Sequence, residues 1–191
     1  RLVNRGITGG RACDSVRVTV APVLVGSANA RIGFEAAIAA LFMRQLSPRY
    51  ISHSELQGAR AVAPGEWRRD LPEVLRAELR ETLALPEATA HSLIATAHAG
   101  DALAAIALVS IDETRLAART FATLDDLVVD APFQSAGVGG RLFDWVCAEL
   151  RGRGIARLFL ESGIGNQGAH RFFEARGCAP VSVTMLKELE A

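Results

Sequence analysis

The chain has 191 residues, half of them hydrophobic, and its 21 basic side chains balance its 21 acidic ones. This composition predicts a soluble globular protein with a sizeable core, and it gives no electrostatic signal for nucleic acid or an anionic membrane. No apolar run is long enough to span a bilayer. The three widely spaced cysteines argue against a disulfide framework, so we expect a cytoplasmic protein.

The first 91 residues predict one strand followed by helices. Residues 1–14 are polar and contain glycine, as is typical of a flexible tail. Valines alternate with other residues over 16–20, as in a strand, and Pro22 stops the pattern. Apolar residues at helical spacing then predict two long helices with short helices and loops between them. The expected ranges are 28–46 and 71–85 for the long helices and 47–72 for the connecting elements.

The second half of the chain is more regular. Strands and helices alternate along it after an expected hairpin turn at 98–101. The expected strands are 91–97, 102–111, 120–129, 155–162 and 181–186, and the expected helices are 140–151 and 166–176. This order predicts an α/β fold with a mixed central sheet of about six to seven strands and helices on both faces.

Three glycines lie within four positions of the stretch FQSAGVGGRLF, residues 133–143, directly before an amphipathic helix. The unpaired N–H groups at a helix N-terminus bind phosphate oxygens, and glycines let the ligand approach the backbone. Two phosphate motifs are excluded, because Gly140 is not followed by Lys-Ser/Thr and Leu142 stands where a dinucleotide fingerprint needs glycine. The turn predicts a phosphate or pyrophosphate cradle, and a plain tight turn is the alternative.

Two linked motifs lie in the second half of the chain. Residues 134–139 read Gln-Ser-Ala-Gly-Val-Gly, which resembles the pyrophosphate pattern Q/R-x-x-G-x-G/A of the GNAT acetyltransferase superfamily. Further along, the pattern N-x-x-A-x-x-Φ-Y-E-x-x-G-Φ, where Φ is hydrophobic, is similar to the stretch that contains Asn166, Ala169, Phe172, Phe173, Glu174 and Gly177. The resemblance covers residues 92–189 well and residues 1–91 only in the order of elements.

The resemblance implies a mostly antiparallel sheet that splays between its fourth and fifth strands. It implies one domain over 15–191, with the strand and substrate-side helices in 15–91 and the cofactor-binding core in 92–191. The implied cofactor is acetyl-coenzyme A, with its pantetheine arm along the fourth strand and its pyrophosphate in the glycine turn. The cofactor-binding residues carried over are Leu127, Val128, Val129, Gln134, Ser135, Ala136, Gly137, Val138, Gly139, Gly140, Asn166 and Phe173.

The implied reaction is direct attack of a primary amine of a small molecule or peptide on the thioester. Glu161 ends a strand at a position that resembles the glutamate base of bacterial ribosomal-protein N-terminal acetyltransferases. Asp126 is the second candidate base, with Asp125 as a further alternative. The family often uses a tyrosine to protonate the leaving thiolate, and Phe173 stands at that position here.

Several hypotheses follow from the missing tyrosine. Water, Ser162, His170 or Tyr50 takes its role, or the chain is a catalytically weak module that binds acyl-coenzyme A. Residues 34–67 and 180–184 are expected to shape the acceptor site. No cluster has metal-ligand spacing, and we expect neither nucleic acid nor membrane as a partner. The sequence is compatible with a homodimer, although no motif in it indicates one.

Overall fold

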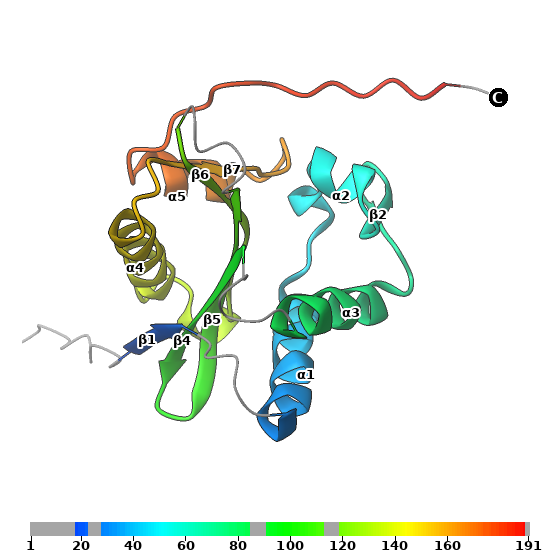
Figure 1. Cartoon of the computed structure of the whole chain (residues 1–191). Helices are drawn as coiled ribbons and strands as arrows, with labels where there is room; N and C mark the ends of the chain where they lie inside the picture. The colour runs from blue at the N-terminus through cyan, green and yellow to red at the C-terminus, as the bar shows by residue number, and fades with distance from the viewer. Residues whose placement is uncertain (1–17, 23–27, 85–90, 113–118, 190–191) are drawn as a thin grey trace, which may run out of the picture.

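The computed structural model describes residues 18–22, 28–84, 91–112 and 119–189 (Figure 1). The expected tail at 1–14 lies outside these residues. The elements in chain order are β1 (Val18–Pro22), α1 (Ala28–Gln45), η1 (Pro48–Tyr50), α2 (His53–Gln57), β2 (Ala61–Ala63), β3 (Glu66–Trp67), α3 (Leu71–Ala84), β4 (Ser92–Ala99), β5 (Ala102–Asp112), β6 (Phe121–Val129), η3 (Ala131–Phe133), α4 (Val138–Gly152), β7 (Arg157–Leu160) and α5 (Gln167–Glu174).

The main sheet is mixed and mostly antiparallel, as the sequence predicted. Its strand order is β1-β4-β5-β6-β7. The first three pairings are antiparallel, and β6 pairs with β7 in parallel. A parallel pair needs a long crossover connection, and α4 supplies it between β6 and β7. The crossover fixes the start of α4 beside the end of β6, where the glycine turn lies.

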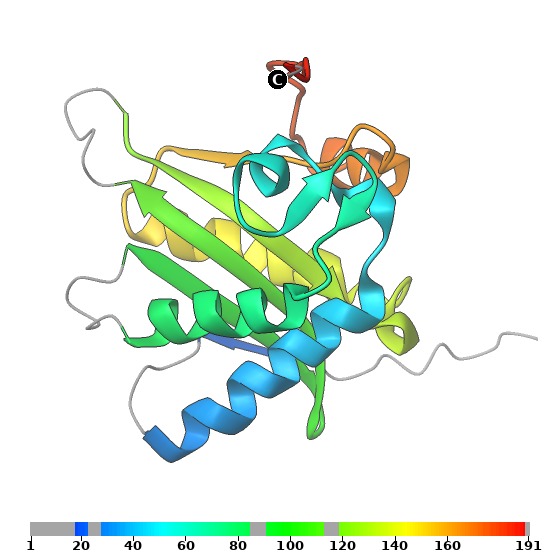
Figure 2. The same ribbon diagram turned by 90° about the vertical axis from the view of Figure 1, so that its right-hand side faces the viewer.

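Helices cover both faces of this sheet (Figures 1 and 2). Alternating side chains of β5 point to opposite faces: Ala105 and Ala107 belong to the cluster with α4, whereas Ile106 packs with α1 and α3. A four-residue repeat of leucines builds the buried stripe of α3 and gives it an amphipathic pattern. These leucines are Leu71, Leu75, Leu79 and Leu83.

The sheet splays between β6 and β7, which are the fourth and fifth strands of the sequence prediction. The two strands pair only where Phe121–Leu124 lies beside Arg157–Leu160. Beyond this point β6 continues to Val129 on the edge of β5, while the chain leaves β7 and turns toward α5. The end of β6 therefore has an open side that faces away from β5.

Two details of the prediction are corrected. The main sheet has five strands in the described part of the chain, fewer than the six to seven expected. Residues 181–186 were expected to form the last strand, but they are exposed and belong to no element. Their alternating pattern fits a strand, yet a strand needs a neighbour to pair with, and the described chain places none beside them. A short β2–β3 hairpin was not predicted.

Candidate functional site

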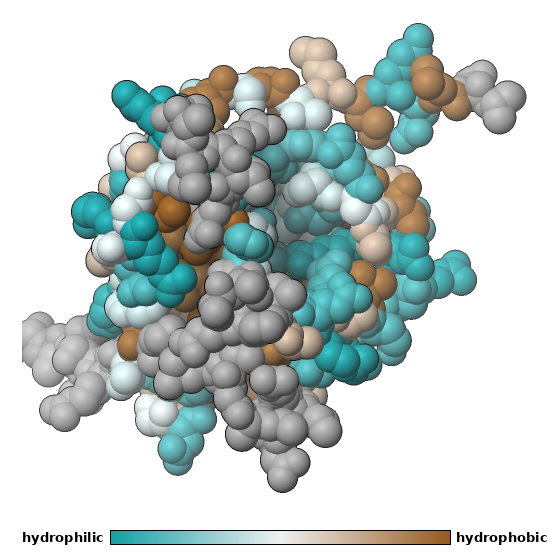
Figure 3. All heavy atoms as spheres, in the orientation of Figure 1, coloured by the Kyte–Doolittle hydropathy of each residue, from teal (hydrophilic) through white to brown (hydrophobic). Residues whose placement is uncertain are grey.

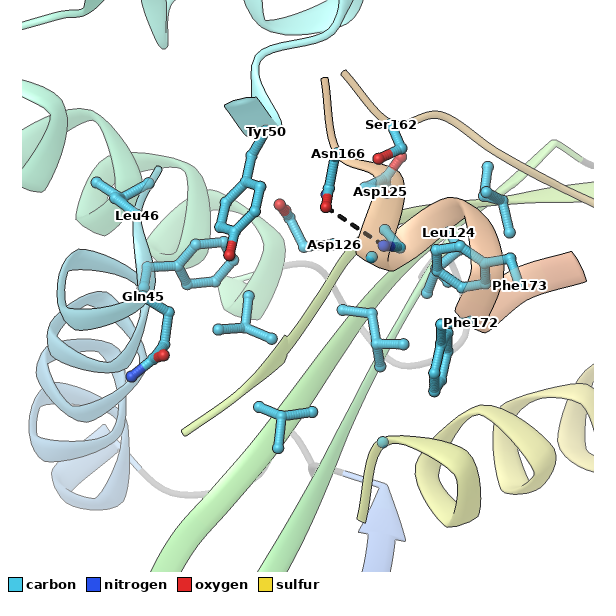
Figure 4. Close-up of a pocket in the computed structure, with 18 of the residues that line it drawn as sticks. Gln45, Leu46, Tyr50, Leu124, Asp125, Asp126, Ser162, Asn166, Phe172 and Phe173 are labelled. Carbon is cyan, nitrogen blue, oxygen red and sulfur yellow. Dashed lines mark hydrogen bonds between the residues drawn. The ribbon is translucent and has the colours of Figure 1, made fainter. Parts of the chain in front are cut away.

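A cavity of about 710 Å³ lies in the splay, within the size range of small-molecule sites (Figure 4). The end of β6, the glycine turn, the start of α4 and α5 form its wall on the sheet side. The end of α1, η1 and the start of α3 close the opposite side. The two halves of the predicted domain thus share one cavity.

The cavity brings together nearly all the residues that the sequence singled out. Ala136, in the glycine turn, and His170, one of the alternatives for the missing tyrosine, do not line it. The candidate site residues that line the cavity are Tyr50, Asp125, Asp126, Leu127, Val128, Val129, Gln134, Ser135, Gly137, Val138, Gly139, Gly140, Glu161, Ser162, Asn166 and Phe173.

The glycine turn ends on a helix N-terminus without a side-chain cap. Gly137 is the N-cap of α4, and its φ of 75° is a left-handed conformation that glycine adopts readily. No side chain of the described residues accepts from the N–H groups at this cap. Because the first turn of a helix has no internal partners for its N–H groups, these donors remain open for an anion at the cavity wall.

Gly139 and Gly140 also have a packing role that the sequence did not indicate. A Cβ atom on Gly139 would lie 3.0 Å from the Val129 side chain and 3.6 Å from the Phe172 ring. On Gly140 it would collide with the guanidinium of Arg176. The two glycines therefore let β6 and α5 approach the start of α4, in addition to baring its backbone.

Arg176 is a cavity residue that the sequence analysis missed. Its guanidinium lies 3.8 Å from the centre of the Phe172 ring, and Nη1 donates to the Phe172 carbonyl at 3.0 Å. Nε is buried and has no hydrogen-bond partner in the described residues. The edge of the guanidinium formed by Nη2 and Nε faces Gly140. The position just before Gly177 in the second motif was the only available signal.

The open side of β6 exposes backbone groups to the cavity. The N–H of Asp130 donates to the Ala104 carbonyl of β5 at 2.9 Å. Backbone groups alternate in direction along a strand, so those of Leu127 and Val129 point away from β5. The Gln134 side chain donates to the Val129 carbonyl at 3.0 Å and thereby ties the turn to the strand. This direction agrees with the expected path of an amide-bearing arm.

Asp126 is held by a buried arginine. Arg60 Nη1 lies 3.0 Å from both carboxylate oxygens, and the Arg60 and Asp126 side chains are 19% and 11% exposed. Arg60 also binds Glu78, with Nη2 2.7 Å from a carboxylate oxygen. Burial raises the pKa of Asp126 to about 6, and the Arg60 charge opposes this rise. Burial also raises the pKa of Asp125, which accepts a 2.6 Å hydrogen bond from Ser110.

Glu161 lies at the end of β7, on the rim of the cavity, with 39% of its side chain exposed. Its Oε2 atom is 3.0 Å from His53 Nδ1 and 3.4 Å from Ser52 Oγ. Both partners come from the start of α2, far from Glu161 in the sequence. This contact places the carboxylate between the sheet and the N-terminal helices.

The other polar candidates differ in their access to the cavity. The Ser162 hydroxyl is buried, lines the cavity and has no hydrogen-bond partner in the described residues. Tyr50 reaches the cavity from the side opposite the sheet (Figure 4). Asn166 caps α5 by accepting from the Ala169 N–H at 3.3 Å, the dashed line in Figure 4. His170 does not line the cavity.

Phe173 is buried and fixed by aromatic contacts. Its ring packs edge-on against Phe172 and Phe143, with centroid distances of 5.0 and 5.6 Å. The side chain is therefore a wall of the cavity, and it brings no hydroxyl to this position.

Charge is unevenly distributed around the cavity. The lining includes four carboxylates, Glu55, Asp125, Asp126 and Glu161, and two guanidinium groups. Arg60 is occupied by Asp126 and Glu78, whereas Arg176 lies at the glycine turn. The cavity thus has a cationic end at the turn and an excess of acidic groups elsewhere.

None of the helices in the described ranges is both long and apolar enough to cross a membrane. Within the same ranges, no three His, Cys, Asp or Glu side chains are grouped so that they could hold a metal ion.

A splayed mixed sheet with a glycine-rich helix N-terminus at the splay is the architecture that the sequence resemblance implied. The model of the Acetyltransferase (GNAT) family matches residues 57–178, more than half of the chain. The chain therefore belongs to the GNAT acetyltransferase family.

Solved structures share this fold at low sequence identity. A transcriptional regulator from Bacillus halodurans C-125 is 14% identical, with a TM-score of 0.64 over 91% of this chain and 100% of the other. An aminoglycoside acetyltransferase from an uncultured soil metagenomic sample is 14% identical, with a TM-score of 0.61 over 93% and 99%. Aminoglycoside N-acetyltransferase AAC(6')-Iy, in complex with CoA, is 15% identical, with a TM-score of 0.61 over the full length of both chains. No curated protein sequence matches the chain.

Proposed function

We propose that the chain transfers an acetyl group from acetyl-coenzyme A to a primary amine of a small molecule or peptide. The observation that carries this proposal is the cavity in the splay, which has open helix N–H groups and Arg176 at one end and carboxylates elsewhere. One end suits a phosphate, and the other suits an ammonium group. Family membership and the CoA-bound neighbour support the choice of coenzyme A.

The residues present fit such a ligand. Arg176 Nε is a buried donor without a protein partner, at the same end as the open N–H groups of α4. A buried unpaired donor is costly, and a phosphate oxygen would satisfy it. The Leu127 backbone and the Val129 N–H can pair with the amides of an extended arm, as a neighbouring strand would, whereas the Val129 carbonyl already accepts from Gln134. When bound, acetyl-coenzyme A supplies an activated acyl group.

We propose Glu161 as the base that removes a proton from the amine. Both oxygens of Asp126 lie at hydrogen-bond distance from Arg60, so Asp126 is poorly placed to accept a proton. Its proposed role is to hold negative charge near the amine. Glu161 is partly exposed on the rim, and His53 and Ser52 approach the same oxygen, Oε2. General-base catalysis is worth about 10²–10⁴-fold in rate.

We propose the Ser162 hydroxyl as the hydrogen-bond donor that replaces the missing tyrosine. It is buried, unpaired and adjacent to Glu161 at the cavity wall. Its role is to donate to the sulfur as negative charge develops there, because Phe173 cannot. Tyr50 also reaches the cavity, so Tyr50→Phe is the comparison for Ser162→Ala. Turnover that falls with Tyr50→Phe and not with Ser162→Ala would transfer the role to Tyr50.

The test begins with binding. Coenzyme A should raise the melting temperature of the chain, because a ligand held by the native state alone stabilises it. Thiol release from acetyl-coenzyme A should then depend on an added amine, measured over a panel of monoamines, polyamines, aminoglycosides and peptides. Glu161→Gln should reduce kcat by at least about 100-fold. Glu174→Gln, on the exposed face of α5, is the matched control and should leave kcat unchanged. Equal turnover in wild type and Glu161→Gln would reject Glu161 as the base.

A second candidate function is an acyl-coenzyme A-binding module with little turnover. Phe173 favours it, since the cavity lacks the usual tyrosine at that position. A clear thermal shift with coenzyme A together with amine-independent thiol release would support this function over transfer. Absence of any shift would exclude both.

A further inference from the structure

Glu161 is the first residue after β7 that the sheet does not hold. The parallel pairing of β6 and β7 ends where Leu124 lies beside Leu160. The cavity opens between the sheet and helices α2 and α3, where hydrophilic residues gather around a hollow in the surface (Figure 3). On the rim of this cavity, a side chain that is 39% exposed samples several rotamers unless its neighbours fix it. A base must be held close to the proton that it removes, so the neighbours of Glu161 bear on the reaction.

The segment that joins α1 to α2, residues 46–52, packs directly on the loop that follows β7. A Cβ atom on Gly163 would collide with the carbonyl oxygens of Arg49 and Ile51, so a larger residue would displace that segment. The loop is closed by its own hydrogen bond, from the Asn166 N–H to the Gly163 carbonyl at 2.8 Å. This packing fixes the start of α2 beside the end of β7.

The start of α2 presents one donor to Glu161. The Ser52 hydroxyl lies 2.6 Å from Glu55 Oε2 and 3.4 Å from Glu161 Oε2. A hydroxyl has a single proton, and the shorter bond to Glu55 takes it. His53 Nδ1 is 3.0 Å from Glu161 Oε2, so His53 is the donor that holds this oxygen. The other oxygen, Oε1, has no hydrogen-bond partner among the described residues.

We propose that His53 is the positioning residue of the base. Its Nδ1–H holds Oε2 of Glu161, so that Oε1 is the oxygen that takes the proton of the acceptor. In this step the proton leaves the ammonium nitrogen of the acceptor and bonds to Oε1, which gives a neutral amine and a carboxylic acid. His53 does not line the cavity and therefore acts through Glu161. The inference rests on the proposed function, because it needs Glu161 as the base.

The contact should affect the reaction more than the stability of the fold. The His53 and Glu161 side chains are 34% and 39% exposed, and water and salt screen a pair of this kind. A misplacement of about 1 Å at a reacting group can nevertheless cost about 100-fold in rate. We therefore expect a loss of kcat without a matching loss in the resistance to urea.

The test uses three substitutions of His53 in the full chain, with acetyl-coenzyme A and one amine from the panel. His53→Ala should lower kcat at least about tenfold, change KM less than about twofold and leave the urea midpoint unchanged. His53→Asn should recover most of the loss, because its amide nitrogen can take the place of Nδ1. His53→Gln places its amide at the position of Nε2 and should not recover it. The matched control is His98→Ala, a half-buried histidine on β4 that does not line the cavity.

Gly163→Ala tests the same contact without changing a polar side chain. It should displace residues 46–52 and lower kcat by a similar factor, and adding His53→Ala to it should cost little more. Gly165→Ala is the control in the same loop, because its Cβ atom would lie 3.7 Å from the Arg49 side chain, an ordinary contact. It should keep full kcat.

The outcomes separate this inference from the proposed function. Adding His53→Ala to Glu161→Gln should leave the residual turnover unchanged, because His53 acts through that carboxylate. Full kcat in His53→Ala together with a loss in Glu161→Gln would overturn the positioning role and leave the base in place. Equal losses in the Ala, Asn and Gln variants would make His53 a structural residue only. Unchanged turnover in Glu161→Gln would reject Glu161 as the base, and no amine-dependent turnover in the wild type would reject transfer itself; either result ends this inference too.

Discussion

Replacing Arg60 with Met should destabilise the protein in a pH-dependent way. Arg60 and Asp126 lie in the cavity wall with side chains only 19% and 11% exposed. Burial raises the pKa of Asp126 to about 6 even with Arg60 present. Methionine keeps an apolar stem in place and removes the positive charge. Without that charge the Asp126 pKa should rise further, because burial is then unopposed by Arg60.

The expected magnitude follows from linkage. Above the unfolded-state value of about 3.9 and below the native pKa, the native state binds more protons, so stability falls as pH rises. In the wild type this interval ends near pH 6. In Arg60→Met it extends higher, so the difference in unfolding free energy should grow by about 1.4 kcal/mol per pH unit above pH 6. Breaking a buried ion pair costs about 3 kcal/mol or more. At about 1.4 kcal/mol per pH unit, the difference in unfolding free energy reaches this size and levels off roughly two pH units above pH 6, near pH 8.

The assay is urea unfolding of both proteins at pH 5.5, 6.5, 7.5 and 8.5, followed by tryptophan fluorescence. Arg60→Met also removes the ion pair with Glu78 and the contact with the Phe42 ring, which adds a pH-independent amount to the difference in unfolding free energy. This amount should be small, because Glu78 is 38% exposed and the ring centre lies 5.9 Å from the guanidinium. In the double variant Arg60→Met, Asp126→Asn, the difference in unfolding free energy from the wild type should no longer grow above pH 6. A difference that stays constant from pH 5.5 to 8.5 would refute the assignment of the pKa shift to Asp126.

Three further predictions concern the turn and α5. Arg176→Met should weaken coenzyme A binding about tenfold, which is the low end for the loss of a charge-assisted hydrogen bond. Binding of pantetheine, which has no phosphate, should stay unchanged when both are measured by calorimetry. Arg171→Met, on the exposed face of α5, is the control. Gly140→Ala should also weaken coenzyme A binding about tenfold, because the added methyl group displaces the Arg176 guanidinium. The loss of stability should be less than about 1 kcal/mol, since this side chain can move aside. Gly152→Ala, where a methyl group would meet no atom within 4 Å, should bind coenzyme A normally. Asn166→Ala should cost about 1 kcal/mol of stability by urea unfolding, and Asn166→Ser should recover most of it, since serine also caps helices.

The parts of the fold that sequence predicted well carry a repeating signal. The leucine stripe of α3 and the apolar strands β4 to β6 each place side chains on one or two buried faces over many residues. The glycine turn alone is a weak signal, and it was identifiable because a second motif, at 166–177, follows it at the separation that the family shows. The path of the cofactor arm along β6 was predicted from the family resemblance and not from the alternation of backbone groups.

The parts that sequence missed depend on contacts between distant residues. Arg60 and Asp126 are 66 positions apart, and neither lies in a motif that names the other. The contact of Glu161 with His53 joins the end of β7 to α2 in the same way. The two- and three-residue strands of the β2–β3 hairpin are too short to show a period. The alternation at 181–186 predicted a strand, but alternation does not specify which edge it pairs with.

The side of the cavity opposite the glycine turn, where we expect the acceptor, is built partly outside the region matched by the family model. Gln45, Leu46, Tyr50 and Glu55 line the cavity and precede residue 57, where the match begins. The glycine turn, α4 and the open side of β6 all lie within it. The family match includes only residues 57–91 of the N-terminal half, so it says less about the acceptor than about the cofactor, and the carboxylates of the cavity provide a further guide. The cavity wall has four carboxylates and only one arginine, Arg176, that is not already paired with a carboxylate. This excess of negative charge favours acceptors with more than one positive charge. Within the amine panel, polyamines and aminoglycosides should therefore give lower KM than monoamines.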